Sequence, residues 1–291
     1  MIIVRGILEE GLLYAIVSLG LYITYKILDF PDLTVDGTFP FGSAISAIMI
    51  LNNVNPVLVL FISFFAGMII GTITGIIHIK FKIRDLLSGI IVMTALYSIN
   101  LNIAGRANLP IFNKENIFRN HFSMWIFPTL RPYTSLIILI FIVLICKLIL
   151  DYYFTTKSGY LLRAVGDNGS LVTSLAKNKG NIKIIGLAIA NGFVALAGAI
   201  YCQHKGFFEI SSGTGTVVIA LANVIIGTKL CQNNKYIKPT TAVIIGSIVY
   251  RAIISFVLLL GIPSNNLKLI TSLLLLIILI VNKSKKGKVI S

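Results

Sequence analysis

Long apolar runs are the feature that most constrains the fold of this chain. A helix needs about 20 residues to cross the roughly 30 Å of hydrocarbon in a bilayer. Of the 291 residues, 56% are hydrophobic and 12% are charged, too few charges for the surface of a soluble protein. Runs long enough to cross lie at 7–28, 57–79, 85–103, 133–150, 183–203, 214–230, 239–260 and 267–282, with a shorter ninth at 39–51. The sequence therefore predicts an all-α integral membrane protein of eight or nine transmembrane helices, with residues 1–291 forming one transmembrane domain.

The net charge of +15 would by itself also suit a nucleic-acid-binding protein. The placement of the basic residues argues against that class, because they gather in short gaps between apolar runs, as in cytoplasmic loops. These clusters are Lys80, Lys82 and Arg84; Lys157, Arg163, Lys177, Lys179 and Lys183; Lys229, Lys235 and Lys238; and Lys283, Lys285, Lys286 and Lys288. We therefore expect a protein embedded in the lipid bilayer, without a nucleic-acid partner.

The basic loops also predict a topology. They place the C-terminus inside and the segments 104–132, 204–213 and 261–266 outside. If the run at 39–51 crosses, nine spans put the N-terminus outside, whereas a re-entrant break that does not cross leaves eight spans and an inside N-terminus. We favour nine. Glu9 and Glu10 stand where a signal peptide would be basic, so we expect the first run to be retained.

Two polar segments resemble each other and suggest an internal duplication. Residues 30–38 match residues 207–214 with one gap opposite Asp36, and each segment follows a long apolar span and precedes another apolar run. Transporters are commonly built from such duplicated halves, whose interrupted helices meet at the substrate path. In the nine-span topology the two copies start from opposite sides of the membrane. The repeat is therefore predicted to be inverted, with a chance likeness as the alternative.

Polar residues inside apolar segments are the candidates for the translocation pathway. Pro31 and Pro40 are expected to interrupt the helical ladder among several acids, although an acidic loop is an equal alternative. Arg251 lies in the middle of an apolar run and needs a partner; we expect a structural ion pair to an acid such as Asp36 or Glu209, or else contact with the substrate. The candidates are Asp29, Asp32, Asp36, Gly37, Phe207, Glu209, Gly213 and Arg251.

Motifs for catalysis are missing from the sequence. There is no G-x-x-x-x-G-K-[ST] phosphate loop, no H-E-x-x-H zinc motif and no G-x-S-x-G elbow. We therefore expect no bound metal or cofactor and no ATP hydrolysis by this chain alone. Gly67, Gly71 and Gly75 form overlapping G-x-x-x-G units, which predict close helix packing within the chain or across a dimer.

The largest inner loop, 151–183, contains an amphipathic stretch interrupted by glycines. Such a stretch suits a helix on the membrane surface or a helix that docks into a groove of a partner protein. The motifs at 159–168, 190–199, 206–207 and 215–227 resemble those of permease subunits in the branched-chain amino acid and ribose class of bacterial ABC importers. Two further motifs, at 28–37 and 261–271, resemble one subfamily of these permeases, which is associated with tryptophan and tyrosine uptake.

The resemblance implies a permease subunit in the bacterial plasma membrane, and ATP hydrolysis on a partner chain. It also implies a second permease copy, two cytoplasmic ATPase subunits and an extracytoplasmic solute-binding protein. The ATPase would dock at Tyr160, Leu161, Arg163, Ala164, Gly166, Asp167 and Asn168. Leu161 and Leu162 stand where the wider class often has a basic residue or alanine, which leaves the identity of the ATPase open.

Two other functions fit part of the sequence. A secondary carrier would use Arg251 and the acids near residues 29–36 as an ion relay. A membrane enzyme or an assembly scaffold would need no transport at all, but the missing catalytic motifs disfavour the enzyme.

Overall fold

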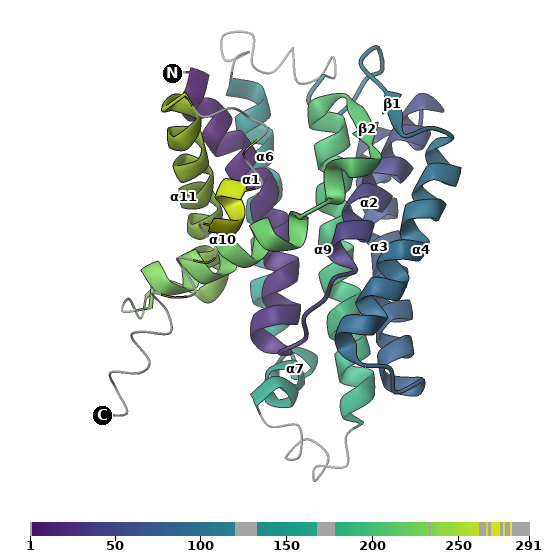
Figure 1. Ribbon diagram of the computed structural model, residues 1–291, viewed down its shortest axis with the longest axis vertical. Coiled ribbons are helices and arrows are strands. Elements are labelled where there is room, and N and C mark those ends of the chain that lie inside the picture. Colours follow the sequence, from purple (N-terminus) through teal and green to yellow (C-terminus); the bar gives the residue numbers. More distant parts are fainter. Residues whose placement is uncertain are drawn as a thin grey trace.

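A computed structural model describes residues 2–119, 133–167, 178–232, 234 and 236–261, with shorter stretches at 266, 269–273, 276 and 280. It consists almost entirely of helices (Figure 1). The elements are α1 (Ile2–Leu21), the π-helix η1 (Tyr22–Ile27), α2 (Val35–Leu51), α3 (Pro56–Lys80), α4 (Asp85–Ala104), β1 (Asn108–Pro110), α6 (Thr134–Thr155), α7 (Lys157–Asp167), α9 (Lys179–Lys205), β2 (Phe207–Glu209), the 3-10 helix η3 (Ile210–Gly213), α10 (Thr216–Leu230) and α11 (Pro239–Leu259).

The helices confirm the predicted class, an all-α integral membrane protein. Within the described residues, 7 helical segments are long and apolar enough to cross a membrane, and α2 is a shorter apolar helix. α2 corresponds to the predicted run at 39–51 but begins earlier. The predicted run at 267–282 lies mostly outside the described residues.

The two short strands connect distant parts of the sequence at one end of the molecule. β1 pairs antiparallel with β2, with Leu109 opposite Phe208. The segments predicted to lie outside, 104–132 and 204–213, therefore meet at one end, which we call the outer end. α1 starts at this end and α7 lies at the opposite, inner end (Figure 1). An N-terminus at the outer end is what the nine-span topology requires.

Several helix ends follow from local sequence. Asn55 begins α3 by accepting a hydrogen bond from the Val57 amide at 2.9 Å, with Pro56 in the first turn. Gly206 ends α9 with φ 82°, a left-handed conformation that costs glycine little. The reversal at Gly206 directs the chain straight into β2.

The chain between α1 and α2 is broken and re-enters the molecule. After η1, a non-helical segment that contains Pro31 turns back and rises to the start of α2 (Figure 1). Pro31 therefore lies in the predicted break, but Pro40 does not end a helix: it lies inside α2. A proline in the second turn still removes the hydrogen bond to the carbonyl four residues earlier, that of Asp36.

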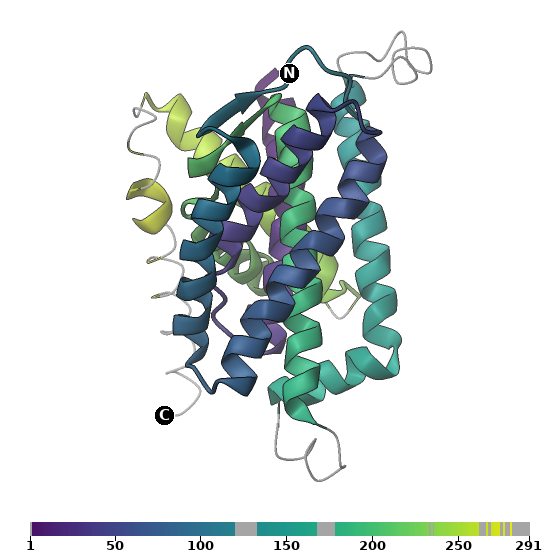
Figure 2. The ribbon, with the colours of Figure 1, turned by 90° about the vertical axis from the view of Figure 1, so that its right-hand side faces the viewer.

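α1 and α9, the helices that precede the two similar segments, each pack against helices that follow the other segment. α1 contacts α10 and α11, while α9 contacts α2 and α3; Figure 2 shows α9 running alongside α3. On α3, a Cβ at Gly67 would collide with the carbonyl oxygen of Asn191, and one at Gly71 with that of Leu187. The glycine face of α3 thus packs against α9 within the chain, which is the first of the two predicted alternatives, packing within the chain or across a dimer.

Candidate functional site

The amino-terminal ends of α2 and α10 meet in the interior of the molecule. Asp36, in the first turn of α2, accepts hydrogen bonds from the amides of Gly215 at 3.0 Å and Val217 at 2.8 Å. Its carboxylate therefore caps the start of α10, where unpaired amides and the helix dipole favour a negative charge. We call this contact the half-helix junction. α10 has 15 residues and spans about 22 Å, which is less than the roughly 30 Å of hydrocarbon in a bilayer.

Glycine allows the two segments of the half-helix junction to approach closely. A Cβ at Gly213 would collide with the Asp36 carbonyl oxygen and lie 2.6 Å from Cδ of Pro40. This is the carbonyl whose helical hydrogen bond Pro40 removes. Pro40 of α2 and Gly213 of η3 thus fit closely against each other.

A buried polar network joins α9 to the break before α2. Asp32, only 1% exposed, accepts hydrogen bonds from the Thr34 amide at 2.9 Å and from Nδ2 of Asn191 at 2.8 Å. Oδ1 of Asn191 accepts one from the Thr38 hydroxyl at 2.8 Å. Because an unpaired polar group at this depth would cost free energy, the network fixes the break against α9.

The predicted pathway residues divide into two groups. Asp32, Asp36, Gly37 and Gly213 lie at or beside the half-helix junction, and Asn100 of α4 donates to the Gly37 carbonyl at 3.1 Å. The remaining candidates are elsewhere: Asp29 is exposed with φ 50°, and Phe207 and Glu209 belong to β2 at the outer end.

The predicted ion pair between Arg251 and an acid is present, but the acid is neither Asp36 nor Glu209, the two examples named from the sequence. The guanidinium of Arg251 forms an ion pair with Glu10 at 2.8 Å and lies 4.8 Å from the ring centroid of Tyr14, both on α1. The reason is the packing of α11 against α1, whereas Asp36 is bound to the start of α10. The relay predicted from Arg251 and the acids near residues 29–36 is therefore not assembled.

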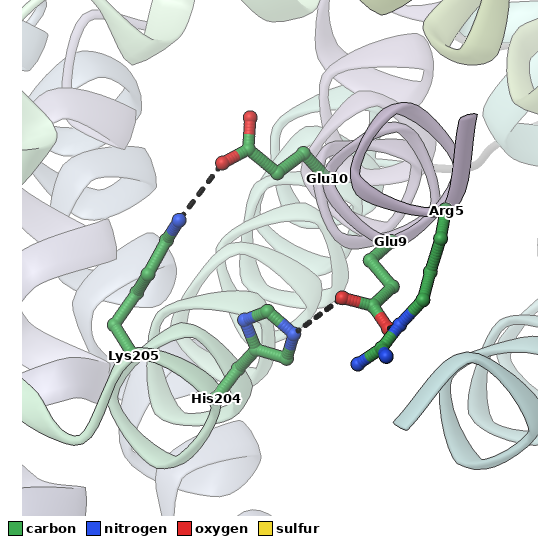
Figure 3. Close-up of polar contacts among 5 residues, drawn as sticks. All are labelled: Arg5, Glu9, Glu10, His204 and Lys205. Carbon is green, nitrogen blue, oxygen red and sulfur yellow. Dashed lines mark hydrogen bonds and ion pairs between the residues drawn. The ribbon is translucent and has the colours of Figure 1, made fainter. Parts of the chain in front are cut away.

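Glu10 belongs to a group of charges that the sequence did not predict. We define the outer charge cluster as Arg5, Glu9, Glu10, His204, Lys205 and Arg251. Figure 3 shows its members from α1 and α9: Glu9 faces Arg5 and His204, and Glu10 faces Lys205. Two adjacent acids within a span were a signal that such a cluster exists, but their partners on α9 and α11 are 195 to 241 residues away.

α7 has a buried face and an exposed face. On the buried face, a Cβ at Gly159 would collide with the Tyr153 carbonyl oxygen and one at Gly166 with that of Ile27, while Leu162 is fully buried. The exposed face presents Tyr160, Arg163 and Asp167, spaced three and four residues apart.

Leu161 and Ala164 of α7 are half-buried and pack against the core. Arg163 also lies 4.8 Å from the ring centroid of Phe154. Asn168, the last predicted docking residue, lies outside the described residues.

Comparisons with known proteins agree with this architecture. Residues 3–280 match the family described as "Branched-chain amino acid transport system / permease component". A tyrosine transport system permease protein from Clostridioides difficile (strain R20291) is 42% identical over 271 residues, which cover 93% of this chain and 88% of the relative. An uncharacterised protein from Rickettsia prowazekii (strain Madrid E) is 33% identical, with 93% and 94% covered.

A ribose import permease protein from Escherichia coli (strain K12) is a more distant relative, 23% identical, with 97% of this chain and 85% of the relative covered. No solved structure matches the chain. The family match covers nearly the whole sequence and includes α7, the half-helix junction and the outer charge cluster. The chain therefore belongs to the permease family of branched-chain amino acid transport systems, which are multi-pass proteins of the bacterial inner membrane.

Proposed function

We propose that this chain forms the translocation pathway of an ATP-driven importer for amino acids with aromatic side chains. A second copy of the chain completes the pore, two cytoplasmic ATPase subunits power it, and an extracytoplasmic binding protein delivers the solute. The family match supports the role of permease. The relative named as a tyrosine transport permease supports the class of solute.

The contact between α7 and η1 is the observation that carries the coupling proposal. Gly166 lies directly against the backbone of Ile27, at the end of η1, with no room for a side chain. The neighbouring Leu28 packs against Gly186 of α9, which also contacts Leu162 of α7. A displacement of α7 would therefore be passed to the chain just before the re-entrant break.

From that point the contacts lead to the half-helix junction. Asp32 and Asn191 join the break to α9, and Asp36 joins α2 to α10. We infer that ATPase closure, acting on the exposed face of α7, shifts the population between inward-open and outward-open arrangements by moving these joined segments.

The test measures ATP hydrolysis and solute uptake with the permease, its ATPase and its binding protein in lipid vesicles. Gly166→Ala introduces a methyl group where the Ile27 carbonyl lies, so we expect solute-stimulated ATP hydrolysis to fall to the unstimulated rate while insertion is retained. Gly6→Ala is the matched control, because a Cβ there meets nothing within 4 Å. Stimulated hydrolysis of Gly166→Ala at the wild-type rate would contradict the coupling role.

The same vesicles distinguish a secondary carrier. Uptake that collapses with an uncoupler but persists without ATP would indicate ion coupling and would overturn the proposed energy source. Copurification of the chain without any ATPase subunit would point instead to a scaffold.

A further inference from the structure

The outer charge cluster contains an imbalance of charge around Glu10. Glu9 is paired with Arg5 at 2.7 Å and with His204 at 3.4 Å. Glu10, in contrast, accepts from both Lys205 and Arg251, each at 2.8 Å. Two cations share one carboxylate, so Lys205 and Arg251 together carry one positive charge more than Glu10 balances.

Arg251 also has an unused donor. Its Nε is buried and has no hydrogen-bond partner among the residues that the structure describes. A buried donor without an acceptor is costly, and such a group commonly marks the position of a ligand or water. The side chains around this atom remain partly exposed to solvent. The exposed fraction is 34% for the side chain of Glu10, 32% for that of Lys205 and 18% for that of Arg251.

A second acid lies near this group. Glu209 is half-buried, and among the described residues its carboxylate accepts a hydrogen bond from the Ser211 hydroxyl and forms no ion pair. Glu209 follows Lys205 by four residues, across the turn at Gly206 that ends α9. Tyr201 precedes Lys205 by one helical turn, so an acid, a cation and an aromatic residue lie close together along the chain at the end of α9.

Aromatic rings complete the surroundings. Tyr14 stacks on Phe39 with centroids 6.2 Å apart, and Phe39 contacts Tyr201 at 5.3 Å. Phe39 is fully buried, whereas the two tyrosines are partly accessible. Aromatic faces of this kind favour another ring as a neighbour.

We propose that Arg251, Lys205, Glu209 and the Tyr14–Phe39–Tyr201 rings bind the zwitterion of an aromatic amino acid within the permease itself. Arg251 and Lys205 bind the α-carboxylate, Glu209 binds the α-ammonium group, and the rings contact the side chain. Glu10 holds the two cations in place when no solute is bound. The inference rests on the proposed function, and it gives the permease a selectivity of its own beside that of the binding protein.

The first experiment measures equilibrium binding of radiolabelled L-tyrosine to the purified permease without its partners. Competitors are tyramine, which lacks the carboxylate, 3-(4-hydroxyphenyl)propionate, which lacks the ammonium group, and L-alanine, which lacks the ring. We expect each to bind at least about tenfold more weakly, as for the loss of one charge-assisted hydrogen bond or one buried ring. No tyrosine binding at millimolar concentration, or equal binding of the analogues, would overturn the site.

Variants locate the binding to these side chains. Arg251→Gln and Glu209→Gln should weaken tyrosine binding about tenfold or more, while Arg251→Lys retains part of it. Glu115→Gln is the matched control, since this acid is exposed and lies outside the outer charge cluster, and its binding should equal that of the wild type. Wild-type binding by a correctly folded Arg251→Gln protein would show that the cluster is only a structural ion pair.

Uptake by the complete importer separates this inference from the proposed function. A raised KM for tyrosine in Glu209→Gln supports the site. An unchanged KM in that variant, in vesicles where the wild type imports tyrosine, refutes the site and leaves the importer role intact. Vesicles in which the wild type imports nothing would refute the importer role instead.

Discussion

At the scale of single residues, acids of one type perform different tasks according to the groups that surround them. Asp36 binds two amides of α10 and Asp32 binds an amide and a side-chain amide, while Asp29 is exposed. Sequence alone marked all three as pathway candidates, because acids within apolar segments are costly unless they have partners. It could not distinguish them, because the partners of Asp32 and Asp36 come from α9 and α10, more than 150 residues away.

Asp36→Asn should lower the stability of the folded protein. The carboxylate offers one oxygen to each of two amides, whereas asparagine would turn its own NH2 group toward one of them. We expect a loss of about 1–3 kcal/mol in the free energy of unfolding, measured by thermal unfolding in detergent. Asp29→Asn removes the same charge from an exposed position with φ 50°, which asparagine tolerates. Equal unfolding temperatures for the two variants would disprove the capping role.

At the scale of elements, apolar length predicted which helices exist but not how each one begins or bends. The predicted runs correspond to α1, α3, α4, α6, α9 and α11 within a few residues, because about 20 apolar residues have few alternatives in a bilayer. The π-turn η1 and the early start of α2 were not predicted. Both depend on contacts from other elements, such as Gly213 against the Asp36 carbonyl, that no local pattern contains.

Packing of α3 against α9 leads to a prediction for Gly71. A methyl group at this position meets the backbone at Leu187 and Ala188 and not a movable side chain. Gly71→Ala should therefore destabilise the protein by about 1–3 kcal/mol, the usual cost of overpacking, as read from its unfolding temperature. Gly6→Ala, at the open position on α1, should unfold like the wild type. An unchanged unfolding temperature for Gly71→Ala would contradict the close approach of these helices.

At the scale of the whole molecule, charge placement predicted which segments share a side. The pairing of β1 with β2 brings the two predicted outer segments together, and α7 lies at the opposite end (Figure 1). The packing of α1 against α10 and α11, and of α9 against α2 and α3, could not be predicted from the likeness of two short segments. Such a likeness compares local sequences and does not state which helices each segment contacts.

Chemical labelling of whole cells tests this topology. Phe112, after β1, and Tyr160, on α7, are 51% and 60% exposed. In a background without Cys146, Cys202 and Cys231, a membrane-impermeant maleimide should label Phe112→Cys in intact cells and label Tyr160→Cys only after the cells are opened. Labelling of both positions in intact cells would contradict the assignment of α7 to the cytoplasmic side of the membrane.

The packing of α9 against α2 and α3 has a consequence for biosynthesis. Asp32 is made early, but its partner Asn191 lies 159 residues further along the chain, so a ribosome needs roughly 8–30 s more to reach it at about 5–20 residues per second. During that interval the early helices expose a buried acid and the glycine face of α3 to lipid or to the insertion machinery. The N-terminal half therefore cannot bury Asp32 and the glycine face of α3 until α9 has been made. A chain arrested before α9 would be a substrate for membrane quality control.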